Sequence, residues 1–172
     1  MKLIIDPKGK KYLMKKGEKE FHTQHGVIKI QKKDGLIETH KGTTYLQVEA
    51  NFTDKLLQCG RGPQVVLPKD AAAIVAHTNL QPGAKVVDAG AGSGWLSSFI
   101  SHYIGPEGRV TTYEIRKEFA KIAKDNFKFL ELTNIKLKNA DITKGIKERK
   151  LDLITLDLLT PTKVPNIPAA LK

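Results

Sequence analysis

The stretch Asp88-Ala89-Gly90-Ala91-Gly92-Ser93-Gly94 decides the fold class of this chain. It stands between a buried strand predicted over residues 85–88 and a helix whose apolar residues recur at 3.6-residue spacing over 96–104. Three glycines at alternate positions let the backbone turn tightly and approach a ligand where a Cβ atom would collide. The helix behind them presents free N–H groups. Since a tight turn alone has the same composition, the flanking segments must distinguish a ligand site from a plain turn.

Helices and strands alternate on both sides of this turn. A helix is predicted to begin near Pro68 and to stop at Gln81-Pro82-Gly83, and another follows over 119–130. Further strands are predicted over 109–114, 135–137 and 151–157. This order predicts an α/β domain of Rossmann-like topology, with a parallel sheet of four readable strands and right-handed crossover helices.

Acidic residues follow the predicted strands. Glu114 comes 26 residues after Asp88, where a carboxylate accepts hydrogen bonds from the ribose hydroxyls of an adenosine cofactor. Asp141 follows the third strand and is expected to reach an adenine amino group, with Ile142 against the ring. Asp157 ends the fourth strand. Ligands of open α/β sheets bind at this edge, so the acids predict a cofactor site.

The glycine spacing identifies the cofactor class. One residue separates Gly92 from Gly94, whereas the dinucleotide fingerprint requires two before its third glycine. The acids also suit a sulfonium cation, which has no pyrophosphate for a helix N-terminus to hold. The pattern from Asp88 to Gly94, D-x-G-x-G-x-G, resembles the first motif of class I methyltransferases. This resemblance implies S-adenosylmethionine (SAM) as the cofactor.

The region before residue 61 follows a different pattern. Short β-type runs at 12–14, 27–30 and 45–48 are separated by Asp34-Gly35 and Lys41-Gly42, which are turn signals. We expect a small antiparallel β domain, barrel-like or sandwich-like, over 1–60, and the methyltransferase-type domain over 61–172.

Composition limits the possible partners. The net charge of +11 favours binding to RNA or DNA through counterion release, although a basic surface can also serve solubility alone.

A single cysteine, Cys59, excludes an intrachain disulfide, and no apolar run is long enough for a signal peptide or a membrane span. A cytoplasmic protein with no membrane contact is expected. His22 and His25 lack further ligands nearby, so no metal site is predicted.

The motifs resemble one family over essentially the whole chain. The chain is similar to the tRNA (adenine-N1)-methyltransferases, in particular the archaeal enzymes that modify T-loop adenines 57 and 58. The similarity is carried by the segments 61–70, 88–94 and 113–116, together with His22-Thr23-Gln24-His25-Gly26 and Thr39-His40-Lys41-Gly42. The resemblance implies a class I methyltransferase fold, SAM as cofactor, tRNA as partner, a β domain that contacts tRNA, and a homo-oligomer, a tetramer in the family.

The resemblance also implies site residues. The implied cofactor contacts are Val66, Gly90, Gly92, Ser93, Gly94, Trp95, Glu114, Asp141, Ile142 and Asp157. Asp157 is the implied catalytic residue beside the target base; a helix N-cap is the structural alternative. Leu159 stands where the family has proline, and Leu67 where an aromatic residue is common, which concerns placement of the target base more than SAM binding.

Other functions stay open at this point. The chain is also compatible with a non-catalytic tRNA-binding subunit or a fragment of such an enzyme, or with a SAM methyltransferase for another substrate such as protein isoaspartate or a precorrin. The family sheet has seven strands, so a shortened chain is expected, with the apolar strand 151–157 as an exposed edge.

Overall fold

The computed structural model describes residues 1–62 and 64–172. Pro63, which belongs to the family-like segment 61–70, lies outside the described residues. The chain divides into two compact units, Met1–Gln58 and Cys59–Lys172. Each unit has its own buried apolar core.

Unit 1 (Met1–Gln58) is built from antiparallel strands. Its elements are β1 (Lys2–Ile5), β2 (Lys11–Leu13), β3 (Glu20–Thr23), β4 (Gly26–Lys29), β5 (Gly35–Glu38), β6 (Thr44–Glu49) and α1 (Phe52–Leu56). Four strands form a sheet in the order β2-β1-β6-β5, and β3 and β4 form a separate hairpin. Ile4, Ile28 and Tyr45 lie in the core between them. The predicted antiparallel β domain is confirmed.

Unit 2 (Cys59–Lys172) alternates helices and strands. Its elements are α2 (Pro68–Thr78), β7 (Lys85–Ala89), α3 (Trp95–Ile104), β8 (Arg109–Tyr113), α4 (Lys117–Phe129), β9 (Ile135–Lys138), the 3-10 turn η1 (Ile142–Lys144), β10 (Leu153–Leu156), the 3-10 turn η2 (Pro161–Lys163) and α5 (Ile167–Ala170). The strands pair in parallel in the order β10-β7-β8-β9. The predicted α/β fold with four parallel strands is confirmed.

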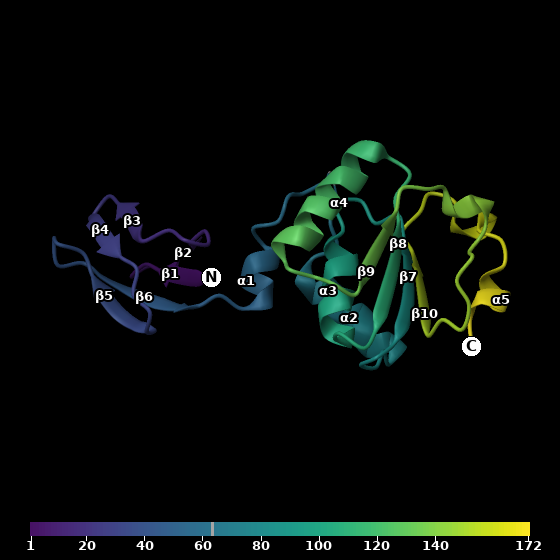
Figure 1. Ribbon diagram of the computed structural model, residues 1–172, viewed down its shortest axis with the longest axis horizontal. Helices are drawn as coiled ribbons and strands as arrows, with labels where there is room; N and C mark the ends of the chain where they lie inside the picture. The colour runs from purple at the N-terminus through teal and green to yellow at the C-terminus, as the bar shows by residue number, and fades with distance from the viewer. Residues whose placement is uncertain (63) are drawn as a thin grey trace. The chain divides into compact units, whose positions relative to one another are not determined.

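Alternate residues of the central strands point to opposite faces of this sheet. Val86 and Val110 face a core formed with α2 and α3, which contains Val75 and Ile100. Val87 and Ala89 contribute to a second core with the segment after β9, including Ile146 and Leu151. Figure 1 shows α2, α3 and α4 on one side of the sheet and α5 on the other. Because both faces are covered, the strands are apolar on both sides, as parallel strands usually are.

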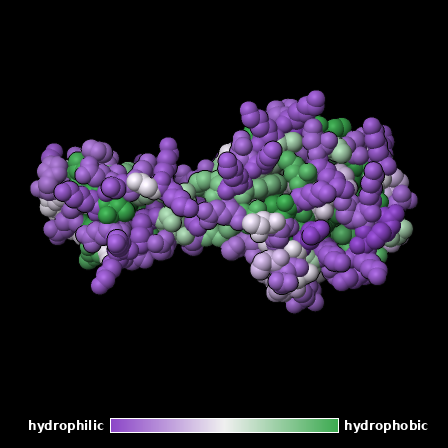
Figure 2. Space-filling view, in the orientation of Figure 1, coloured by the Kyte–Doolittle hydropathy of each residue, from purple (hydrophilic) through white to green (hydrophobic). Residues whose placement is uncertain are grey.

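The surface is mainly hydrophilic, with smaller hydrophobic patches in the view of Figure 2. Among the described residues, no helix combines the length and apolar character needed to cross a membrane.

Candidate cofactor and substrate site

The Gly-rich turn lies where the chain leaves β7 and enters α3, at the carboxyl edge of the sheet. Its three glycines all have positive φ, but they face different neighbours. A Cβ atom on Gly90 would collide with the carbonyl oxygen of Asp157, and one on Gly94 would lie 2.6 Å from the ring of Phe127. A Cβ on Gly92 would meet nothing nearer than 4.0 Å. Two glycines therefore allow close packing within the protein, and Gly92 borders open space.

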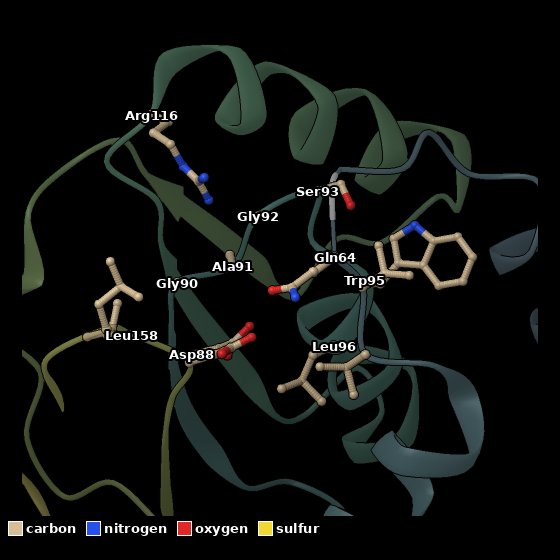
Figure 3. Close-up of a pocket in the computed structure, with 14 residues that line it drawn as sticks. Gln64, Asp88, Gly90, Ala91, Gly92, Ser93, Trp95, Leu96, Arg116 and Leu158 are labelled. Carbon is tan, nitrogen blue, oxygen red and sulfur yellow. The ribbon is translucent and has the colours of Figure 1, made fainter.

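Two cavities meet at this edge. The first, about 320 Å³, is lined by Gln64, Val65, Val66, Asp88, Gly90, Ala91, Gly92, Ser93, Trp95, Leu96, Arg116, Asp157, Leu158 and Leu159 (Figure 3). The second, about 340 Å³, is lined by Gly90, Tyr113, Glu114, Ile115, Arg116, Ala140, Asp141, Ile142, Thr143, Asp157, Leu158, Leu159 and Thr160. They share the backbone of Gly90, the Arg116 side chain and residues 157–159. The segment after β10 thus runs along both cavities.

The structure brings the predicted site residues together at this edge. Val66, Ser93 and Trp95 line the first cavity, Glu114, Asp141 and Ile142 line the second, and Gly90 and Asp157 line both. Gly94 lines neither cavity; it is the residue from which α3 begins, packed against α4. Their roles toward a cofactor stay predictions.

Glu114 holds the Gly-rich turn in place. Its side chain is buried, and one carboxylate oxygen accepts a hydrogen bond from the Gly92 N–H at 2.7 Å. The other oxygen accepts from the backbone N–H of Arg116 at 2.9 Å and from its Nε at 3.1 Å. Burial raises the pKa of Glu114, but the bonds from Arg116 and Gly92 outweigh burial and hold the pKa below its usual range. The site therefore contains a fixed carboxylate anion.

Asp88 has a structural environment. Its carboxylate is buried, and it accepts hydrogen bonds from the hydroxyls of Ser97 and Thr155, the latter at 2.6 Å. Burial raises its pKa, since desolvation outweighs these two bonds. Asp88 therefore joins α3 and β10 to β7, with both oxygens already accepting bonds from protein hydroxyls.

Asp157 and Asp141 differ from these buried acids. Asp157 is exposed at the end of β10, and its backbone N–H donates to Ala89 at 2.9 Å. Asp141 precedes η1, and one of its oxygens accepts from both the N–H and the hydroxyl of Thr143. These two hydrogen bonds from Thr143 lower the pKa of Asp141. Both acids lie on the cavity walls, where their side-chain oxygens can accept further hydrogen bonds.

Ser93 has the one buried side-chain oxygen that lacks a hydrogen-bond partner among the described residues. The residue is 1% exposed and lines the first cavity. Leaving a buried hydroxyl unpaired costs about 1–3 kcal/mol. A polar ligand group in the cavity would remove that cost.

Three residues of this site were not predicted from the sequence. Gln64 and Arg116 extend their side chains into the first cavity, as Figure 3 shows, whereas the Trp95 indole points away from it. Asn126 on α4 accepts from the Gly60 N–H and donates to the carbonyls of Gly60 and Ser93, each at 2.8 Å. Asn126 thus fastens the segment before α2 to the Gly-rich turn. Gln64 and Arg116 lie in the family-like segments 61–70 and 113–116, whereas Asn126 lies in no such segment.

Comparison with known proteins identifies relatives of this chain. Residues 57–172 match the family described as tRNA methyltransferase complex GCD14 subunit. The chain is 34% identical over 191 residues to the tRNA (adenine(57)-N(1)/adenine(58)-N(1))-methyltransferase TrmI of Methanocaldococcus jannaschii, which covers 95% of this chain and 68% of the relative. The chain thus spans about two thirds of that relative's length.

Solved structures agree with this match. A SAM-dependent O-methyltransferase from Thermotoga maritima superposes with a TM-score of 0.86 at 28% identity, covering 99% of this chain and 67% of the other. The tRNA (m1A58) methyltransferase TrmI from Aquifex aeolicus superposes with a TM-score of 0.71 at 28% identity, covering 87% and 60%. With the fold, the Gly-rich turn and the strand-end acids in place, the chain belongs to the tRNA methyltransferase complex GCD14 subunit family, alongside the TrmI tRNA (adenine-N1)-methyltransferases.

Proposed function

We propose that this chain transfers a methyl group from SAM to N1 of an adenine in the T loop of tRNA, at position 57, 58 or both. The observation that carries the proposal is the meeting of a Gly-rich turn with three acids, Glu114, Asp141 and Asp157, around two adjoining cavities. The name of the archaeal relative supports tRNA adenine as the acceptor.

The residues at this edge fit SAM chemically. Glu114 would accept bonds from the ribose hydroxyls, and Asp141 from the adenine amino group, with Ile142 against the ring. Gly92 offers a backbone surface that no side chain covers, and Val66 supplies an apolar wall. The unpartnered Ser93 hydroxyl has room for a bond to a polar group of the ligand. Bound SAM supplies an activated methyl group on a sulfonium sulfur.

The chemistry required of the protein is mainly orientation. Adenine N1 has an in-plane lone pair, which forms the new N–C bond as the S–C bond breaks and its electron pair stays on sulfur. Since no proton must leave N1, a strong base is unnecessary. Asp157 would accept a hydrogen bond from the exocyclic amine, hold the base in line, and stabilise the positive charge that develops on the ring. The base must leave its stack to reach this pocket.

A second acceptor class has one observation in its favour. The Thermotoga relative that superposes over 99% of this chain is described as an O-methyltransferase. Methyl transfer to a hydroxyl oxygen releases a proton, so a hydroxyl acceptor needs a base, whereas a carboxylate oxygen or adenine N1 does not. The identity of the methylated atom separates the two.

Nucleoside analysis tests the proposal. The chain is incubated with labelled SAM and an unmodified tRNA transcript, and digested nucleosides are identified by mass spectrometry. We expect 1-methyladenosine, and its loss in a transcript with guanine at both positions 57 and 58. A ribose- or protein-linked methyl group would instead favour the oxygen acceptor. SAM binding without any transfer would favour the non-catalytic subunit.

The remaining parts of the proposal concern context. We propose a tetrameric assembly and a cytoplasmic location, as the family resemblance implies, and unit 1 as a tRNA contact. Sedimentation of the purified chain tests the assembly.

A further inference from the structure

Unit 1 contains a hollow that the proposed reaction does not use. Its volume is about 480 Å³, and it is lined by Asp6, Pro7, Lys8, Lys10, Tyr12, Phe21, His22, Thr23, Gln24, His25 and Tyr45. These residues come from the β1–β2 turn, from β2, from β3 and its turn into β4, and from β6. The hollow lies wholly within unit 1.

Aromatic rings form the apolar part of this hollow. Tyr12 and Phe21 are half-buried, with ring centroids 5.0 Å apart and planes inclined at 46°. Tyr45 is buried beside them in the core of the unit. Exposed aromatic faces at a protein surface are the feature on which unstacked nucleobases lie, because every base has a π face.

Lysines on a fixed turn border the rings. One carboxylate oxygen of Asp6 accepts from the backbone N–H groups of Lys8, at 2.9 Å, and Lys10, at 2.8 Å. The Gly9 N–H donates to the Asp6 carbonyl at 2.9 Å, which closes the turn. The Lys10 ammonium lies 5.1 Å from the centre of the Tyr12 ring. The one acid in the hollow is thus occupied by its own turn, and the lysines stay exposed for an anion.

The β3–β4 turn supplies polar groups on another wall. The Thr23 hydroxyl donates to the Gly26 carbonyl at 2.9 Å and accepts from the His25 N–H at 3.0 Å, which fixes the turn. His22, Gln24 and His25 are exposed around it. No group of three or more metal-ligating side chains occurs in the part of the chain that the structure describes. The histidines are therefore better suited to hydrogen-bond a ligand than to hold a metal.

We propose that this hollow binds one unstacked nucleotide of single-stranded RNA. The base lies against Tyr12 and Phe21, the phosphate contacts Lys8 and Lys10, and the β3–β4 turn meets the polar edge of the base. Unit 1 as a whole supports an anionic ligand, with twelve lysines and seven acidic residues. The inference rests on the proposed function in one respect: RNA is taken as the natural ligand.

Photo-crosslinking locates the site. The full chain is irradiated with a short single-stranded RNA that carries 4-thiouridine, and crosslinked peptides are identified by mass spectrometry. Affinity for the same RNA is measured by fluorescence anisotropy for the wild type, for K8A/K10A, for Phe21→Leu and for K32A/K33A. Phe21→Leu keeps apolar bulk but removes the aromatic face. K32A/K33A removes the same charge from exposed lysines that do not line the hollow.

We expect crosslinks in peptides that contain residues 12 and 21–25. We also expect at least a tenfold weaker affinity for K8A/K10A and a weaker affinity for Phe21→Leu, with K32A/K33A changed by less than threefold. Equal losses for both lysine pairs, no effect of Phe21→Leu, or the absence of crosslinks in these peptides would overturn the proposal. The proposed function fails separately, by absence of 1-methyladenosine, because crosslinking needs neither SAM nor methyl transfer.

Discussion

At the residue scale, the acidic residues near the two cavities of unit 2 are of two kinds: those already bonded within the protein and those able to bind a ligand. Asp88 and Glu114 are buried and already accept bonds from protein donors. Asp141 lies at the cavity wall and Asp157 is exposed there. Asp141 and Asp157 therefore have more capacity to meet a ligand, whereas in the proposed SAM complex Glu114 would share its oxygens between the Gly92 turn and the ribose.

Ser93→Ala tests whether the first cavity binds the polar part of SAM. Because the Ser93 hydroxyl lacks a partner, its removal should leave the free energy of unfolding unchanged or slightly higher. The Kd for SAM should rise roughly 2–10-fold, the value of one neutral hydrogen bond. Denaturant unfolding and calorimetric titration measure the two quantities.

Ser98→Ala is the matched control. The Ser98 hydroxyl is equally buried but donates to the Gly94 carbonyl at 2.7 Å, away from the cavity lining. It should leave SAM affinity unchanged. If Ser93→Ala destabilises the chain and binds SAM as the wild type does, Ser93 is structural.

At the element scale, the glycines of the β7–α3 turn have separable functions. Gly90→Ala and Gly94→Ala place a methyl group against Asp157 and Phe127, so each should destabilise unit 2 by about 2 kcal/mol or more. Gly92→Ala enters open space and should cost only about 1–2 kcal/mol for its positive φ, yet weaken SAM binding. Equal destabilisation by all three, with normal SAM affinity of Gly92→Ala, would contradict this division.

The contribution of Asp88, which joins α3 and β10 to β7, to the stability of unit 2 should depend on pH. Burial raises the folded-state pKa of Asp88, so its contribution to stability is present below the ordinary value of 3.8 and is lost as pH rises. The unfolding free energy of the wild type minus that of Asp88→Asn should therefore fall from pH 3 toward neutral pH. Urea unfolding at several pH values measures it.

Asp152→Asn is a control for which the stability difference should change with pH in the opposite direction. Asp152 accepts from Lys172 at 2.5 Å and from the Lys85 N–H at 2.8 Å, and these bonds lower its pKa. The unfolding free energy of the wild type minus that of Asp152→Asn should therefore rise as pH increases above the lowered pKa of Asp152. If the stability difference changes with pH in the same direction for Asp88→Asn and Asp152→Asn, the environment of Asp88 does not favour the protonated form of its carboxyl group.

Element prediction from sequence worked best where periodicity was strong. The helices α2, α3 and α4 and the strands β7 to β10 follow from apolar spacing and from Gly and Pro stops. The strands β1, β3 and β5 were not predicted from the sequence, and β1 pairs with β6, more than 40 residues away. Such pairing depends on tertiary contacts rather than on local pattern.

At the scale of the whole molecule, the candidate site was predictable in kind but not in detail. Strand-end acids meet at one edge because parallel strands share a direction, so Glu114, Asp141 and Asp157 were found from sequence. Asn126 was not, because a buried amide within a helix has no sequence pattern that reveals its bonds to Gly60 and Ser93. The position of residues 157–159 along both cavities likewise depends on packing against Gly90.

The most direct test of the account compares the wild type with Asp157→Asn in methyl transfer to a tRNA transcript, with SAM affinity measured on both. We predict that the wild type forms 1-methyladenosine. Asp157→Asn should lower the rate about 100-fold, since it removes a charge that acts on the developing cation, while the Kd for SAM changes by less than about threefold. Full activity of Asp157→Asn, or a methyl group on another atom of the RNA, would contradict the assignment of Asp157 and of the reaction.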